Sequence, residues 1–206
     1  MGPGSSLRRL LLSVACAVLF AAVYLVAVRT GPGQRVDERA FQLLYSLAPQ
    51  GTVPLVTLFA RGVVIVVLAS LVTLLAMAAV GRGAWRAVVA STLIVGVTVV
   101  ATTFLRDDVL TRPRLSDEAF PQNSMPSTHV SVACALTVAA VVLWPRDRPW
   151  WLLNTAAVVV LLAALGNVLG QAHRFSDVVA SVLLVGAVSG LALAVLRPKR
   201  GERRPP

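Results

Sequence analysis

The chain has 206 residues, of which 57% are hydrophobic and only 14% are charged, and its mean hydropathy is +0.79. Such values exclude a soluble globular domain as the body of the chain. The formal net charge is +10 at pH 7. We therefore expect an all-α, polytopic membrane protein that forms one compact transmembrane domain.

Hydrophobic runs predict six transmembrane helices joined by short connections. The first run is too long for a signal-peptide core and has no convincing cleavage site, so we expect it to be retained. The segment 29–51 has a helix-like apolar spacing that is too short to span, which predicts a helix at the membrane surface. Residues 34–48 of this segment either cover a functional site as a lid or lie beside it. The expected spans are 10–28, 62–80, 85–105, 127–144, 152–170 and 178–196.

Polar segments separate these spans. A charged segment, 106–118, follows the third span and leads into the polar turn 123–129, which has the sequence Asn-Ser-Met-Pro-Ser-Thr-His. A second polar break, 171–177, precedes the sixth span. The tail 197–206 is basic and contains proline, so we expect it to be disordered.

The distribution of charge predicts the topology. With the N-terminus inside, six spans place most arginines and lysines on the inner face, where Asp147 and Glu202 are the only acids. The outer face carries nearly balanced charge, as the positive-inside rule requires. We therefore expect a multi-pass protein of the cell membrane with both termini cytoplasmic, and we attribute the basic character to membrane anchoring and not to nucleic-acid binding.

In this topology the two histidines of the chain, His129 and His173, lie on the extracytoplasmic face. They are 44 residues apart, about the length of two spanning helices and a turn. Asp177 follows His173 by four residues and shares its helix face, so its carboxylate can hold one imidazole nitrogen protonated and leave the other as a nucleophile. A simple helix-capping role for Asp177 is the alternative.

The turn before His129 is typical of an anion site. Backbone N–H groups at a helix start, with the hydroxyls of Ser127 and Thr128, suit a phosphate, although either hydroxyl could equally serve as an ordinary N-cap. Arg106, Arg112 and Arg114 lie just upstream, and arginine forks bind phosphate well.

Together these residues predict a metal-free phosphoryl-transfer site. Arginines and helix-start amides would hold the phosphate, one histidine would attack it and the other would protonate the leaving oxygen. A metal site is less favoured, because the sequence has no His-x-x-x-His or Cys-x-x-Cys pair, and no cofactor is expected. Cys16 and Cys134 fall in apolar runs and are expected to be small buried residues without a disulfide.

These motifs resemble those of the type 2 phosphatidic acid phosphatases (PAP2), a superfamily of membrane lipid phosphatases related to bacterial acid phosphatases and vanadium haloperoxidases. That family has three blocks: Lys, six residues and Arg-Pro; then Pro-Ser-Gly-His; then Ser-Arg, five residues, His, three residues and Asp. The matching residues here are Arg112-Pro113, Pro126-Ser127-Thr128-His129, and His173 with Asp177.

The resemblance covers the third to sixth spans and implies a role for each residue. His173 would be the nucleophile that forms a phosphohistidine, Asp177 its orienting carboxylate, and His129 the acid for the leaving group. The phosphate would be held by Arg106, Arg112, Ser127 and Thr128, where Arg106 stands one residue closer to Arg112 than the family lysine.

Two positions depart from the family pattern. Thr128 replaces a glycine and crowds the expected approach of the phosphate. The Ser-Arg pair falls on Gly166 and Asn167, and the loss of one arginine is expected to cost several kcal/mol in the transition state unless Arg174 or Arg114 replaces it.

The sequence thus predicts a lipid phosphate or diphosphate phosphatase that acts at the outer membrane face. Polyprenyl diphosphates, phosphatidic acid and phosphatidylglycerol phosphate are the substrate classes that the resemblance implies. Two alternatives remain: a lipid phosphotransferase that uses the same site, and a non-catalytic protein that binds or transports lipid phosphates.

Overall fold

The computed structural model describes residues 3–47, 49–115, 123–145 and 149–196, and this part of the chain is helical, without a strand. The predicted all-α fold is therefore confirmed. The α-helices are α1 Pro3–Val23, α2 Gly31–Leu47, α3 Val53–Leu58, α4 Val64–Gly81, α5 Trp85–Phe104, α6 Thr128–Leu143, α7 Trp150–Leu169 and α8 Phe175–Leu196. Short π-helical turns, η1 Tyr24–Val28, η3 Phe59–Val63 and η4 Leu105–Val109, extend or join them, and a 3-10 turn, η2 Gln50–Thr52, precedes α3.

Five helical stretches within the described residues are long and apolar enough to cross a membrane: Ser6–Val28, Val53–Gly81, Trp85–Val109, Trp150–Leu169 and Phe175–Leu196. The helix that carries the second expected span, 62–80, already begins at Val53 and passes through η3 without interruption. The fourth expected span is the apolar helix α6, whose 16 residues make it shorter than a typical span.

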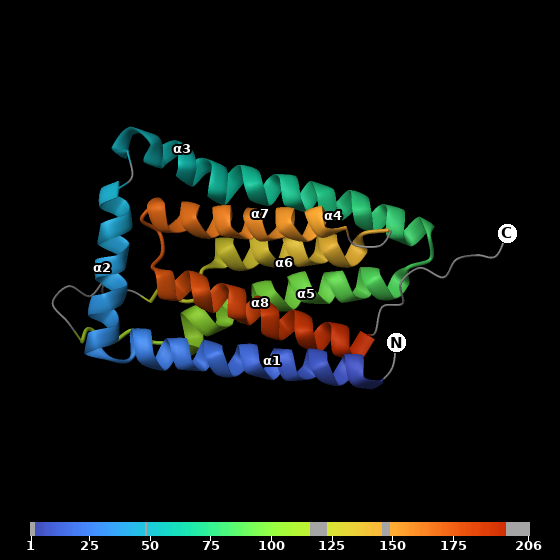
Figure 1. The fold of residues 1–206 in the computed structure, drawn as a ribbon, viewed down its shortest axis with the longest axis horizontal. Helices are drawn as coiled ribbons and strands as arrows, with labels where there is room; N and C mark the ends of the chain where they lie inside the picture. Colours follow the sequence, from blue (N-terminus) through green and yellow to red (C-terminus); the bar gives the residue numbers. More distant parts are fainter. Residues whose placement is uncertain (1–2, 48, 116–122, 146–148, 197–206) are drawn as a thin grey trace.

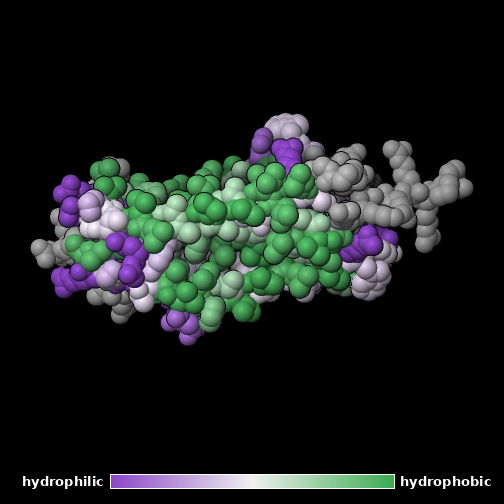
Figure 2. Space-filling view, turned by 90° about the horizontal axis from the view of Figure 1, so that it is seen from below, coloured by the Kyte–Doolittle hydropathy of each residue, from purple (hydrophilic) through white to green (hydrophobic). Residues whose placement is uncertain are grey.

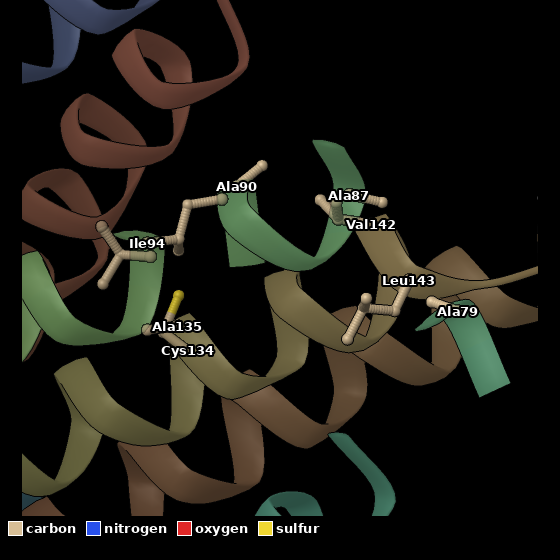
Figure 3. Packing of buried hydrophobic residues seen from close by; sticks show 9 residues of the cluster. Ala79, Ala87, Ala90, Ile94, Cys134, Ala135, Val142 and Leu143 are labelled. Carbon is tan, nitrogen blue, oxygen red and sulfur yellow. The ribbon is translucent and has the colours of Figure 1, made fainter. Parts of the chain in front are cut away.

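α6 is the central helix of the bundle. Eleven of its 16 residues are buried, so it is apolar on all sides, as a helix enclosed by others must be. Figure 3 shows one part of this core, where alanines of α4, α5 and α6 pack around Ile94, Cys134 and Leu143. Small residues let the helix backbones approach closely, which is how helices associate in a membrane.

α8 lies beside α1 and runs antiparallel to it (Figure 1). Arg9 Nη1 donates a hydrogen bond to the carbonyl of Leu193 at 2.8 Å, and Ser13 Oγ donates to that of Ala187 at 2.6 Å. The start of α1 and the end of α8 therefore lie at the same end of the bundle.

α2 crosses the opposite end of the bundle, roughly perpendicular to the other helices (Figure 1). One face of it is buried and carries Gln34, Asp37, Glu38 and Phe41, whereas Arg35 on another face is exposed. Gln34 Nε2 donates to the carbonyls of Val28 and Pro113, at 2.8 and 2.6 Å. The sequence correctly predicted a helix here that is too short to span, and the structure places it over the end of the bundle.

The outer surface suits a lipid environment. The face shown in Figure 2 is mainly hydrophobic along the bundle, and most of its hydrophilic residues gather toward the two ends. Exposed apolar side chains such as Leu74, Val100 and Leu161 belong to the predicted spans. The chain is a multi-pass membrane protein.

Both cysteines are free: Cys134 is buried, as expected, whereas Cys16 is partly exposed and packs near Gly186. The predicted disordered tail, 197–206, lies outside the described residues.

Candidate active site

The structure brings both histidines to the end of the bundle that α2 covers. His129 is the second residue of α6, and His173 lies in the turn between α7 and α8. The backbone links the two helix starts, because the N–H of Ser127 donates to the carbonyl of Asp177 and Ser181 Oγ donates to the carbonyl of Ser127, at 3.4 and 3.1 Å. The two imidazoles lie within electrostatic range of each other. The two imidazoles therefore belong to one site.

Asp177 is the centre of the polar contacts in this site, and it is completely buried. Its Oδ2 accepts hydrogen bonds from Ser124 Oγ at 2.5 Å and from the backbone N–H of Arg174 at 3.0 Å. The second contact caps the start of α8, as a capping box does. The same oxygen lies 3.6 Å from His173 Nδ1, which is beyond hydrogen-bond length but close enough for an ion pair. Asp177 thus both caps the helix and faces the imidazole.

Arg112 is buried between two carboxylates. Its Nη2 lies 3.4 Å from Asp177 Oδ1 and 3.6 Å from Asp37 Oδ2, and it donates to Ser176 Oγ at 3.4 Å. Its Nε has no hydrogen-bond partner among the described residues. The guanidinium is therefore held at the site by weak, long contacts.

Arg106 also reaches the start of α6. Its Nη1 donates to Thr128 Oγ1 at 2.6 Å, while Nε and Nη2 donate to the two carboxylate oxygens of Asp107 at 2.7 and 3.1 Å. Most of its fork is therefore engaged by a neighbouring acid. Arg106 thus connects the end of the third expected span to the first residue of α6.

Ser127 is the N-cap of α6, since its Oγ accepts the N–H of Val130 at 3.4 Å, and it is fully buried. The ordinary capping interpretation of this turn is thus observed. Thr128 follows as the first helical residue, so the first amides of α6 and its positive dipole end face the same region as His129.

Sequence reasoning missed two acids of α2, Asp37 and Glu38. Asp37 accepts hydrogen bonds from the N–H and the Oγ of Ser176, and Glu38 Oε2 accepts Arg174 Nε at 2.8 Å. Burial raises the pKa of Asp37, and the nearby Asp177 raises it further, against the opposing effect of Ser176 and Arg112. The available signal was their place on the same helix face as Phe41, since two acids on the apolar side of an amphipathic helix require partners.

Asn167, which stands where the family pattern has an arginine, is buried on α7. Its Nδ2 donates to the carbonyl of Ala163 in its own helix at 2.8 Å, and its Oδ1 has no partner among the described residues. Two arginines were expected to replace the missing charge, Arg174 and Arg114. Arg174 pairs with Glu38 and stacks over the ring of Phe41, with 5.5 Å between the guanidinium carbon and the ring centroid, whereas Arg114 is exposed.

The arrangement combines a histidine next to a buried carboxylate, a second histidine at a helix start and two arginines. These groups can together bind a phosphate, attack it and protonate a leaving oxygen. No group of three or more potential metal-ligating side chains occurs in the ranges that the structure describes.

The family model described as PAP2 superfamily matches residues 84–202. No curated protein and no solved structure matches the chain.

Proposed function

Because this match spans more than half of its length, the chain belongs to the PAP2 superfamily, whose general activity is that of a phosphatase, and we propose that it hydrolyses a lipid phosphate or diphosphate. The observation that carries the proposal is the cluster of His173, Asp177, His129 and Arg112 at one end of the bundle. His173 and Asp177 are four residues apart, whereas His129 and Arg112 come from two other segments of the chain.

The proposed reaction has two steps. Nε2 of His173 attacks the phosphorus, the bond to the lipid oxygen breaks, and His129 gives its proton to that oxygen. The product is a lipid alcohol or a lipid monophosphate, with the phosphoryl group on His173. His129 then takes a proton from water, the water oxygen attacks the phosphorus, and inorganic phosphate leaves as His173 is released.

The contacts of Asp177 support this division of roles. Its carboxylate faces Nδ1 of His173, so it favours the positive charge that the imidazole acquires during attack, and Nε2 is directed away from it. Arg112 lies within 3.4 Å of the same carboxylate and can exchange this weak contact for a phosphate oxygen.

We further propose that the site faces the extracytoplasmic side of the cell membrane. The start of α1 and the end of α8 share one end of the bundle, and the candidate site lies at the other. Cytoplasmic termini, as the charge distribution favours, would leave the site outside. A lipid substrate would have its chains in the bilayer and its phosphate at the membrane interface. Its phosphate would then lie at the same depth in the membrane as the two histidines.

Two related functions compete with hydrolysis. A phosphotransferase would use the same phosphohistidine and pass the group to a lipid or sugar hydroxyl in place of water. A non-catalytic binding or transport protein is favoured by one specific observation: the partners of Arg112 and Arg174 are carboxylates, and Asn167 adds no charge.

The test is phosphate release by purified protein from polyprenyl diphosphate, phosphatidic acid and phosphatidylglycerol phosphate, with EDTA present. Wild type is compared with His173→Ala and His129→Ala. We expect release by wild type, and a loss of about 10³-fold or more in His173→Ala. Appearance of a phosphorylated acceptor when an alcohol is added, without free phosphate, would indicate the phosphotransferase. Lipid binding without either product would indicate the binding protein.

A further inference from the structure

Gly166 of α7 and Gly170, the residue that caps its C-terminal end, bring α7 into close contact with the helix that contains α3 and η3. A Cβ atom on Gly166 would lie 2.3 Å from the Cβ of Ala60, and one on Gly170 would lie 2.4 Å from Thr57 Oγ1. No side chain larger than hydrogen fits at either position without a shift. The two helices therefore cross almost backbone to backbone at Gly166 and Ala60.

This crossing lies at the level of the candidate site. Val168, two residues after Gly166, packs in one cluster with Val130 next to His129 and with Val178 next to Asp177. Arg61 follows Ala60 directly and therefore lies one residue from this crossing. Among the charged groups that act on His129, Arg61 has the strongest effect, ahead of His173 and Arg106.

Arg61 differs from the other arginines of the site in its partners. Arg106, Arg112 and Arg174 each contact a carboxylate, whereas Arg61 makes no hydrogen bond or ion pair with any residue of the described ranges. It is only partly exposed. A cation that no carboxylate of the described residues pairs with therefore lies within electrostatic range of His129.

The position of Arg61 along its helix makes its positive charge energetically unfavourable. It lies within the apolar stretch Val53–Gly81, about 12 Å from its start at about 1.5 Å per residue. A charged side chain inside a spanning helix is unfavourable and is retained for a function. It also lies in the π-helical turn Phe59–Val63, and such turns occur often at functional sites.

We propose that Arg61 is a phosphate ligand, which binds the phosphoryl group that lies between His129 and His173. Through the crossing at Gly166 it supplies, from the facing helix, the positive charge that Asn167 lacks. This inference rests on the proposed function for the identity of the anion, a phosphoryl group, but the binding itself does not require turnover.

The test compares Arg61→Gln and Arg61→Lys with Arg35→Gln. Arg35 lies on the exposed face of α2 at the same end of the bundle, so its loss changes the net charge equally without touching the site. Each protein is assayed for phosphate release and, independently, for the rise in Tm that inorganic orthovanadate produces. The Tm without vanadate checks that each variant is folded.

We expect Arg61→Gln to lower kcat/KM by about 10²-fold, in line with the loss of one donor to a transition-state oxyanion. It should also abolish the vanadate-dependent rise in Tm. Arg61→Lys should recover part of both effects, and Arg35→Gln should remain within about threefold of wild type, as befits a solvent-exposed charge.

Equal behaviour of Arg61→Gln and Arg35→Gln, in an active wild type, would overturn the inference and leave the proposed function intact. A wild type that hydrolyses nothing, but whose vanadate response depends on Arg61, would contradict the proposed function and support the inference.

Discussion

At the scale of single residues, Asp177 illustrates how one side chain serves the fold and the site together. Its carboxylate caps α8 through the N–H of Arg174, accepts Ser124, and faces both His173 and Arg112. A buried carboxylate needs such a set of donors. The cap fixes the carboxylate, and the fixed carboxylate in turn orients the imidazole.

The leaving-group role of His129 predicts a dependence on substrate chemistry. His129→Ala should lower kcat by about 10²- to 10⁴-fold on a lipid phosphate, whose alkoxide must be protonated as it leaves. The loss should be much smaller on p-nitrophenyl phosphate, whose leaving group is stable as an anion. Steady-state kinetics on both substrates test this, and an equal loss on both would contradict the acid role.

The raised pKa of Asp37 predicts a pH-dependent stability. The folded state binds the proton of Asp37 more tightly than the unfolded state does. The free energy of unfolding therefore falls as the pH rises from 3.8, the ordinary pKa of an aspartate, through the higher pKa of the folded state. Asp37→Asn cannot ionise and removes this contribution. The Tm of wild type should therefore fall relative to that of Asp37→Asn as pH increases across this window. Parallel Tm curves would show that Asp37 does not titrate differently in the two states.

At the scale of helices, the crossing of α7 with α3 and η3 holds one wall of the site. Nothing but hydrogen fits at Gly166, since an added Cβ would meet the Cβ of Ala60. Because the contact joins two Cβ atoms on rigid helices, neither can rotate away. The separation of these helices, and with it the position of Arg61, is therefore set by two small residues.

Gly166→Ala should destabilise the protein by about 1–3 kcal/mol through overpacking. Ala60→Gly removes the opposing Cβ, so the double variant should recover part of this loss even though glycine weakens the helix by about 1 kcal/mol. Unfolding in a denaturing detergent measures the coupling energy.

The matched control is Gly96→Ala in α5, because nothing lies within 4 Å of a Cβ at that position. It should leave stability unchanged or raise it by up to about 1 kcal/mol, as alanine favours a helix. Destabilisation at both glycines alike, or strict additivity of Gly166→Ala and Ala60→Gly, would argue against the close crossing.

At the scale of the whole molecule, the two ends of the bundle carry different groups. One end carries the site and its cover, α2, and the other carries the start of α1 and the end of α8 (Figure 1). Between them, α6 is enclosed by the other helices. A helix that other helices shield from lipid need not match the thickness of the bilayer, so α6 can be shorter than a typical span.

This arrangement predicts the sidedness of surface positions. In a background without Cys16 and Cys134, Arg35→Cys at the site end should react in intact cells with a membrane-impermeant maleimide. Arg82→Cys, which follows α4 at the other end, should react only after the membrane is permeabilised. The reverse pattern would place the site in the cytoplasm.

Most of the fold was predictable because long apolar runs leave the backbone no alternative to helix in a membrane. The histidines, Asp177 and the arginines before Pro113 were found because their spacing is local or matches a known pattern. Asp37 and Glu38 were missed, since their partners Ser176 and Arg174 lie more than 130 residues away along the chain. Only the packing of α2 over the end of the bundle brings such residues to the site.

The most direct test of the account is to look for the covalent intermediate on His173. The protein is mixed with a lipid substrate labelled in its terminal phosphate and is denatured in alkali within the first turnover. We expect label on the protein that survives alkali, is released by acid as a phosphohistidine is, maps to His173, and is absent from His173→Ala. Rapid phosphate release without any trapped label, or label that persists in His173→Ala, would contradict the mechanism.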